Sequence, residues 1–311
     1  MTIDLLKIGA RGSPLSLAQT GLVAKALEKA HPGLATEIIP IKTTGDKMRD
    51  VSLAQIGGKG VFVKEIEEAL LSRTVDLAVH SAKDLPAELP AGLILAAVPE
   101  RADLRDVLVT REEGGLKSLR FEAVVGTSGL RRQAQLLALR PDLKIVPIRG
   151  NIETRIKKVE NEVEATILAA AGLARLGLEP EHFEALPPEI MLPSPGQGTL
   201  ALEARIDDLD VLKAVSVINH QATYVCLAAE RGFLRRLGTG CQLPVAAWAR
   251  LQGRVMAFEG LIASIDGSRL LRESRTAELD SAEAAANFGK MLATELLDMG
   301  GLEIMKEAGL V

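Results

Sequence analysis

Short hydrophobic runs alternate with amphipathic stretches along this chain, a pattern typical of α/β proteins. The first run, residues 5–10, predicts a strand. Ser13 and Pro14 follow it and favour a helix start, because Ser supplies a capping oxygen and Pro suits the first helical position. Apolar residues then recur at helical spacing up to His31, and residues 35–41 predict another strand. This order predicts a βαβ unit of a mostly parallel sheet.

A second apolar run, residues 75–79, ends in polar residues, and Pro86 excludes a continuing central strand. Lys83 and Asp84 stand at this exit. Ligands of open α/β sheets bind beyond the carboxyl ends of strands, so this pair can anchor an anion and stabilise a developing positive charge. A plain turn with solvated charges is the alternative.

Residues 43–60 form a polar, glycine-rich stretch before a helix predicted at 61–72. Glycines on both sides of Lys59 let the backbone move while it presents one ammonium group. The stretch is therefore either an ordinary solvent loop or a mobile lid.

The α/β pattern continues to the end of the chain. We expect strands at 96–99, 107–110, 123–126, 145–148, 165–170, 199–204, 245–251 and 254–264, and helices up to residue 140 and at 208–217, 221–237 and 281–299. The Pro/Gly-rich segment 192–198 predicts a hinge.

Arg131 and Arg132 fall in the first turn of the helix that follows the predicted strand 123–126. We expect Thr127 and Ser128 to cap this helix. Cations at a helix N-terminus oppose the helix dipole, so the placement predicts an anion between the two arginines.

The same arrangement recurs further along the chain. Asn151 is a plausible N-cap, and the arginines at or just past strand ends are Arg11, Arg131, Arg132, Arg149, Arg155 and Arg175. Such a ring in a net-acidic protein predicts an enclosed site for a polyanion, and guanidinium groups suit carboxylates and phosphates alike.

The composition of the chain argues against nucleic-acid-binding, membrane-spanning and disulfide-rich proteins. The 311 residues are 47% hydrophobic and carry a formal charge of −4, which argues against general nucleic-acid affinity. No run of about 18 apolar residues predicts a membrane span, and the first residues lack the apolar core of a signal peptide. With two cysteines a disulfide framework is implausible, so we expect a cytoplasmic location. We also expect a monomer.

The two cysteines differ in their surroundings. Cys226 lies in a predicted helix among apolar neighbours and is expected in the core. Cys241 lies in a loop with glycines before it and Pro244 after it, so its thiol is expected to be exposed and nucleophilic or modified. We expect no metal site, because CxxC is absent and the four histidines lack ligand spacing.

Several blocks of the sequence resemble the porphobilinogen deaminase family, also called hydroxymethylbilane synthases. They occur in the family's order: RGSPLSLAQ (11–19), TTGD (43–46), GGKGVFVKE (57–65), HSAKDLP (80–86), GTSGLRR (126–132), RGNIETR (149–155), LAAAGLARLG (168–177), PGQG (195–198) and GTGCQLP (238–244). The blocks span residues 7 to about 250 and are highly specific in combination.

The resemblance implies an enzyme that joins four porphobilinogen molecules head to tail and releases four ammonia molecules. It implies a dipyrromethane cofactor held by a thioether to Cys241, and Asp84 as the central catalytic carboxylate. The catalytic set would be Asp84, Lys83, Arg11, Arg149 and Arg155. Cofactor contacts would come from Asp84, Lys83, Ser81, Thr127, Ser128, Arg131 and Arg132, and substrate contacts from Arg11, Ser13, Gln19, Lys59, Arg149, Arg155 and Arg175.

We expect three α/β domains, of which two are periplasmic-binding-protein-like open sheets joined by hinges and the third is smaller. We expect domain 1 at 1–99 and 199–216, domain 2 at 100–198 and domain 3 at 217–311. Gly129 stands where the family usually has a serine, and Leu104 replaces a common proline.

Two other classes of protein stay open at this point. A hinged receptor for a small anion would explain the βαβ pattern and the arginines, but it leaves Cys241 and a third domain unexplained. A thiol-dependent transferase would use Cys241 as its nucleophile, yet no histidine lies in its local sequence to act as base.

Overall fold

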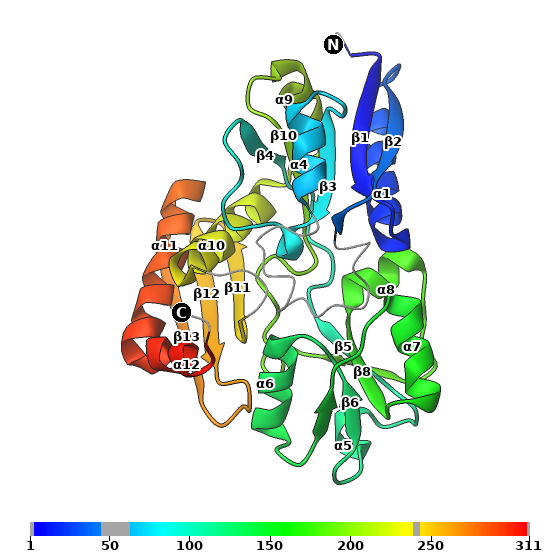
Figure 1. The fold of residues 1–311 in the computed structure, drawn as a ribbon. Coiled ribbons are helices and arrows are strands. Elements are labelled where there is room, and N and C mark those ends of the chain that lie inside the picture. The colour runs from blue at the N-terminus through cyan, green and yellow to red at the C-terminus, as the bar shows by residue number, and fades with distance from the viewer. Residues whose placement is uncertain (1–2, 45–62, 239–242, 310–311) are drawn as a thin grey trace. The chain divides into compact units, whose positions relative to one another are not determined.

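The computed structural model describes residues 3–44, 63–238 and 243–309 (Figure 1). The chain divides into two compact units, each built from two segments that are distant in the sequence. Unit 1 comprises Met1–Ala102 and Thr199–Tyr224, and unit 2 comprises Asp103–Gly198 and Val225–Val311. Our division into three domains, with its boundaries, stays a prediction.

Unit 1 contains a five-stranded mixed sheet. Its order is β2 (Ala35–Ile41), β1 (Leu5–Arg11), β3 (Leu77–Ser81), β10 (Leu200–Arg205) and β4 (Leu93–Ala97). The first three strands run parallel, and β10 is antiparallel to both of its neighbours. The predicted βαβ unit is confirmed, because β1 and β2 pair in parallel over seven residues and α1 (Pro14–Ala30) connects them.

Helices cover both faces of this sheet. On one face α1 contributes to a core with Leu6, Ile8 and Leu77, and on the other α4 (Lys64–Leu71) packs Ile66 and Leu70. A further helix, α9 (Leu209–Ser216), begins at an Asp208 cap. The predicted Ser13 cap is also confirmed: its hydroxyl oxygen accepts a hydrogen bond from the Ser16 N–H at 3.3 Å.

Unit 2 contains a second five-stranded mixed sheet with the same topological order. That order is β7 (Lys144–Val146), β6 (Val124–Gly126), β8 (Ala165–Ala169), β5 (Asp106–Thr110) and β9 (Phe183–Leu186). In each sheet the antiparallel strand, β5 or β10, is the first that the chain forms after it crosses between units. This repeat of one topology confirms the predicted pair of open α/β sheets.

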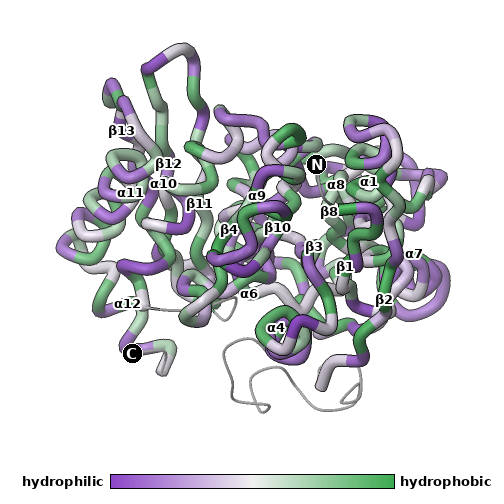
Figure 2. The backbone as a smooth tube through the Cα atoms, turned by 90° about the horizontal axis from the view of Figure 1, so that it is seen from above, coloured by the Kyte–Doolittle hydropathy of each residue, from purple (hydrophilic) through white to green (hydrophobic). Residues whose placement is uncertain are grey.

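The helices of this sheet follow its strands. They are α5 (Gly115–Ser118), α6 (Leu130–Leu139), α7 (Ile152–Asn161) and α8 (Ala170–Leu176). The predicted Asn151 cap of α7 is confirmed, because its side-chain oxygen accepts from the Thr154 N–H at 2.8 Å. Only Val159 is buried on α7, and Figure 2 accordingly shows this helix as mostly hydrophilic.

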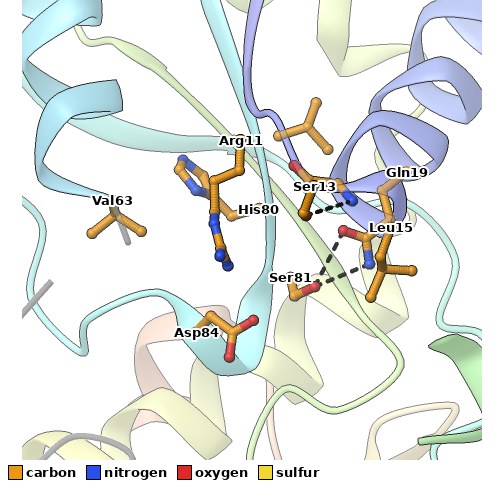
Figure 3. A pocket seen from close by; sticks show the side chains of 10 residues that line it. Arg11, Ser13, Leu15, Gln19, Val63, His80, Ser81 and Asp84 are labelled. Carbon is orange, nitrogen blue, oxygen red and sulfur yellow. Dashed lines mark hydrogen bonds between the residues drawn. The ribbon is translucent and has the colours of Figure 1, made fainter. Parts of the chain in front are cut away.

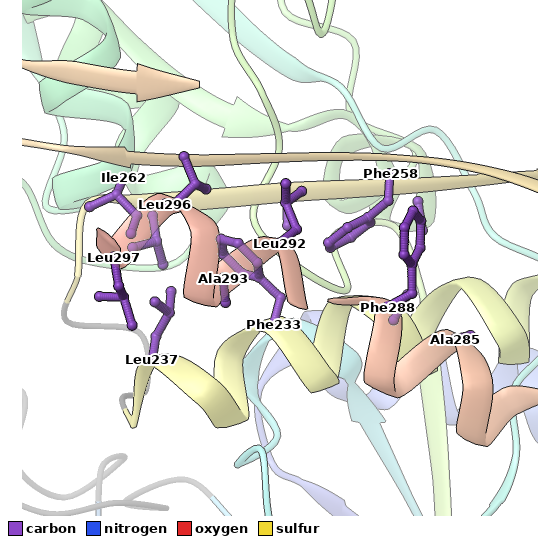
Figure 4. Close-up of a cluster of buried hydrophobic side chains, with 14 of the residues drawn as sticks. Phe233, Leu237, Phe258, Ile262, Ala285, Phe288, Leu292, Ala293, Leu296 and Leu297 are labelled. Carbon is purple, nitrogen blue, oxygen red and sulfur yellow. The ribbon is translucent and has the colours of Figure 1, made fainter. Parts of the chain in front are cut away.

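Unit 2 also contains a three-stranded antiparallel sheet with β11 (Val245–Gln252), β12 (Val255–Ala263) and β13 (Leu270–Glu278). The helices of this part are α10 (Gln221–Leu237), which enters unit 2 at Val225, α11 (Ala282–Leu296) and α12 (Leu302–Glu307). Phe233, Phe258 and Phe288 form the centre of its core, with Phe233 edge-on to Phe258 at 5.8 Å between ring centroids (Figure 4). The predicted smaller C-terminal α/β part is confirmed, and Cys226 lies in this core as expected.

Some predicted boundaries are wrong. The strand expected at 96–99 lies at Leu93–Ala97, and strands β9 and β13 were not predicted. The final helix expected at 281–299 ends its regular part at Leu296, because Gly300 adopts a φ of 110°. No described helix is long and apolar enough to cross a bilayer.

Helices α10 and α11 approach so closely that side chains are excluded between them. A Cβ atom on Gly289 would lie 1.9 Å from the Ala229 carbonyl oxygen, and one on Gly232 would lie 2.1 Å from that of Ala286. We therefore expect Gly289→Ala to lower the free energy of unfolding by about 1–3 kcal/mol, measured by urea denaturation, because the helices must separate.

Gly21→Ala is the control, because a Cβ atom at this position in α1 meets no atom within 4 Å. It is expected to leave stability unchanged or raise it by up to about 1 kcal/mol. Equal effects of the two substitutions would contradict the close helix approach.

Candidate active site

The exit of β3 presents charged side chains beyond the strand end, as predicted. A single 3-10 turn, Ala82–Asp84, follows Ser81 and is closed by the Leu85 N–H, which donates to the Ala82 carbonyl at 3.3 Å. The Ala82 N–H donates to the Thr199 carbonyl at 3.0 Å and ties the turn to the segment that enters β10. Asp84 is exposed and Lys83 is half-buried.

A pocket opens in unit 1 beside this turn (Figure 3). Its lining combines cationic, anionic and hydroxyl groups with apolar walls, from Arg11, Ser13, Leu15, Ser16, Gln19, Val63, Val79, His80, Ser81 and Asp84. Arg11, the last residue of β1, points its guanidinium toward Asp84 in Figure 3. A carboxylate that faces a guanidinium can stabilise a cation while the guanidinium binds an anion.

Hydrogen bonds fix two of the polar groups that line this pocket. The Gln19 amide N–H donates to Ser81 Oγ at 3.0 Å, and Ser81 Oγ lies 3.2 Å from the Gln19 carbonyl oxygen (Figure 3). This pair joins α1 to the end of β3, so the two side chains hold the pocket wall in one arrangement.

In unit 2, Asp106 supplies the anion between Arg131 and Arg132. Arg131 donates to Asp106 Oδ2 at 2.7 Å, and Arg132 donates to Asp106 Oδ1 at 2.7 Å. The Asp106 carboxylate has no exposed surface. Burial lowers the pKa of Arg131, and the charge of Asp106 opposes that shift. The predicted anion is therefore present, and it is a side chain of this chain.

Three arginines of unit 2 act on one another electrostatically. Burial lowers the pKa of Arg155, and the positive charges of Arg132 and Arg149 lower it further. The Arg155 Nε–H donates to the Gly150 carbonyl at 3.0 Å, which fixes the side chain across the turn. An anion that binds among these arginines reduces the electrostatic repulsion between them, so this cluster can bind carboxylates.

Comparison with known proteins decides the family. The model of "Porphobilinogen deaminase, dipyromethane cofactor binding domain" matches residues 6–213, and that of "Porphobilinogen deaminase, C-terminal domain" matches residues 224–298. The porphobilinogen deaminase of Syntrophomonas wolfei is 52% identical over 97% of this chain and 98% of its own length. That of Syntrophobacter fumaroxidans is 48% identical over 99% of each chain. The chain belongs to the porphobilinogen deaminase family.

It is therefore an enzyme of tetrapyrrole biosynthesis, and the receptor alternative is not favoured. Solved structures give weaker likenesses. The match to an ancestral cationic amino acid solute binding protein covers 76% of this chain and 91% of that protein, at 15% sequence identity and with a TM-score of 0.43.

Porphobilinogen deaminases bind dipyrromethane, and the described residues fit such a group. By the family resemblance its pyrroles carry acetate and propionate side chains, and the cluster of Arg132, Arg149 and Arg155 offers positive charge for them. When bound, dipyrromethane supplies the pyrrole carbon to which the first substrate is joined.

Unit 1 brings together five of the predicted site residues around its pocket: Arg11, Ser13, Gln19, Ser81 and Asp84. Lys83 lies on the same turn but is not among the residues that line the pocket. Arg175 lies on α8 in unit 2, where burial lowers its pKa and it donates to the Gly198 carbonyl at 2.7 Å. Lys59 and Cys241 lie outside the described residues.

The expected hydroxyl cap of α6 is wrong. Gly129 occupies the N-cap position, so no side chain of the N-cap residue can accept a hydrogen bond from the first turn. Thr127 Oγ1 instead accepts from the Gly129 N–H at 3.2 Å, and Ser128 Oγ donates to the Ile148 carbonyl at 2.7 Å. Both hydroxyls therefore hold the loop between β6 and α6, and their contact with cofactor stays a prediction.

Sequence reasoning missed several buried polar residues around these sites. Gln197, of the PGQG block, donates to Asp106 at 3.1 Å and to the Leu104 carbonyl at 2.8 Å. Glu203 interrupts the apolar run from Leu200 to Ala204 in β10, and Glu67 is buried on α4. A charged residue within an apolar run was the available signal for Glu203, whereas Asp106 stands at the first position of β5, before the apolar run. Among the described residues, no group of three His, Cys, Asp or Glu side chains could hold a metal ion.

Proposed function

We propose that this chain joins four porphobilinogen molecules head to tail with release of four ammonia molecules. One water molecule then cleaves the bond to the cofactor and gives hydroxymethylbilane, the linear precursor of haem-type tetrapyrroles. The match of the cofactor-binding-domain model to residues 6–213 carries this proposal, because that range contains both the Asp84 pocket and the arginine cluster. Dipyrromethane is held by a thioether to Cys241 and primes the chain.

Each condensation breaks one carbon–nitrogen bond and forms one carbon–carbon bond. The aminomethyl group of the substrate takes up a proton and leaves as ammonia, and the resulting azafulvene is cationic. This azafulvene would form the new carbon–carbon bond at the free pyrrole position of the bound chain, and the proton at that position would be lost. The Asp84 carboxylate accepts hydrogen bonds from pyrrole N–H groups and stabilises the cation, while Arg11 opposite binds a substrate carboxylate.

The remaining predicted residues bind carboxylates. Arg149 and Arg155 hold those of the growing chain, and Arg131, Arg132, Thr127 and Ser128 contact the cofactor. The electrostatic cluster of Arg132, Arg149 and Arg155 supports this assignment. Lys83 and Ser81 complete the cofactor contacts beside Asp84, while Lys59, Ser13, Gln19 and Arg175 complete the substrate site.

We further propose a three-domain monomer that works in the cytoplasm without nucleic acid. The domains are 1–99 with 199–216, 100–198 and 217–311. The net charge of −4 supports the absence of nucleic-acid binding, and the three separate sheets support the division.

Intact mass spectrometry tests the cofactor assignment directly. The purified protein, supplied with porphobilinogen, is expected to exceed its sequence mass by two linked pyrrole units, and Cys241→Ala is expected to lack this excess. Cys226→Ala is the matched control and should keep it, because Cys226 is buried in the C-terminal core. A chain that never gains this mass would contradict the proposed function.

A further inference from the structure

Three titratable side chains from three elements gather in the core of unit 1 behind the pocket. His80 on β3 is 5% exposed, Glu203 on β10 is 0% exposed and Glu67 on α4 is 8% exposed. His80 Nε2 lies 3.0 Å from Glu203 Oε2, and the charges of both residues act on Glu67. Two carboxyl groups and one imidazole thus share a small apolar volume.

The surroundings of Glu67 move the pKa of its carboxyl group into the neutral range. Burial and the charge of Glu203 raise its pKa to about 7, while His80 opposes the shift. Within the described part of the chain, one oxygen each of Glu67 and Glu203 has no hydrogen-bond partner. An unpartnered buried carboxylate is costly, so Glu67 is neutral below this pH and adds a buried negative charge above it.

The cluster is connected to the pocket by two routes. His80 lines the pocket beside Arg11 and Asp84 while its Nε2 contacts Glu203 (Figure 3). Val63 also lines the pocket, and its carbonyl accepts from the Glu67 N–H at 2.9 Å. A change of charge on Glu67 therefore acts directly behind the pocket wall.

We propose that Glu67 is a positioning residue that sets the charge behind the pocket and so controls how tightly the carboxylates of the substrate bind there. It acts through His80, which lines the pocket beside Arg11, and does not touch the substrate. The proposal rests on the proposed function, because the anions concerned are the acetate and propionate groups of porphobilinogen. Neutral Glu67 leaves the attraction of Arg11 intact, and ionised Glu67 opposes it.

Other charged groups face α4 from the elements packed against it. They are Lys7 and Arg11 on β1, His80 on β3, and Glu203 and Arg205 on β10. Strand β4 also packs against α4, and it carries no charged residue. On α4 itself Lys64, Glu65 and Glu68 are charged. Arg205 donates to Asp76, Asp208 and the Leu70 and Val75 carbonyls. Glu203 and His80 therefore dominate the surroundings of Glu67 together with burial.

The test is the pH dependence of KM for porphobilinogen in the cofactor-loaded enzyme. KM of the unmodified enzyme is expected to rise about three- to tenfold through an inflection near pH 7, with a smaller change in kcat. Glu67→Gln should remove the inflection and keep the low KM at high pH. Glu68→Gln is the matched control, because this neighbouring side chain is 62% exposed, and it should keep the inflection.

Titration of the substrate is common to all three proteins, so only an inflection lost in Glu67→Gln and kept in Glu68→Gln supports the proposal. The same inflection in all three would overturn it. If the unmodified enzyme forms no bilane at any pH, the proposed function itself fails.

A second measurement does not depend on the variant folding. Infrared difference spectra of the unmodified protein should show a neutral carboxyl band that disappears as pH rises through about 7. A band that titrates together with KM supports the proposal, and the absence of a titrating band overturns it.

Discussion

Asp84→Ala is expected to reduce the rate of bilane formation by at least about a hundred- to a thousandfold. The carboxylate faces Arg11 across the pocket, at the place where the proposed mechanism develops a cation (Figure 3). Without it, no anion of the exposed turn stabilises that charge. Ammonia release and bilane formation, followed in single-turnover experiments with cofactor-loaded protein, measure the loss.

The fold should survive this substitution. Asp84 is exposed, and the turn that carries it is held by backbone hydrogen bonds of Ala82 and Leu85. We expect the free energy of unfolding to change by no more than about 0.5 kcal/mol. A substitution that lowered activity only in proportion to lost stability would contradict a catalytic role.

Two further variants separate charge from shape. Asp84→Asn keeps the size of the side chain but removes its charge, and it should lose nearly as much activity as Asp84→Ala. Asp4→Ala removes an exposed carboxylate just before β1, at the end of that strand opposite Arg11, and should leave activity unchanged. Near-normal bilane formation by Asp84→Ala would exclude Asp84 as the central catalytic group.

Local signals predicted the parts of the fold that local interactions determine. The β1–α1–β2 unit was predicted within one residue, because Ser13 and Pro14 start the helix and its end at His31 is followed by Pro32 and Gly33. Strand β13 was missed, because its sequence is largely polar and all nine of its residues are partly or fully exposed. It forms through nine residues of pairing with β12, which no local pattern reports.

The site shows the same division between local and distant causes. The arginines after strand ends could be predicted because each follows its own strand in sequence. Their partner Asp106 could not, because it lies 25 residues from Arg131 and 26 from Arg132. Glu203 likewise meets His80 across 123 residues, through the antiparallel pairing of β10 with β3.

Asp106→Asn is expected to lower the free energy of unfolding by about 3–5 kcal/mol, because it leaves Arg131 and Arg132 buried without their counter-ion. The Asp106 carboxylate also accepts from Gln197, so its loss loosens the PGQG segment as well. Urea denaturation monitored by circular dichroism measures the change. Asp103→Asn is the matched control: its ion pair with Arg105 is exposed, and its loss should cost no more than about 1 kcal/mol.

Equal losses in the two variants would contradict a structural role for the buried Asp106 pair. A triple variant, Asp106→Leu with Arg131→Met and Arg132→Met, goes further, because apolar side chains of similar volume can replace a buried ionic group without loss of stability. If the arginines also bind the cofactor, the triple variant should regain most of the stability lost in Asp106→Asn yet fail to gain the mass of two pyrrole units. A stable triple variant that carries cofactor normally would mean that Arg131 and Arg132 serve the fold alone, and that the remaining cationic side chains of the site bind its carboxylates.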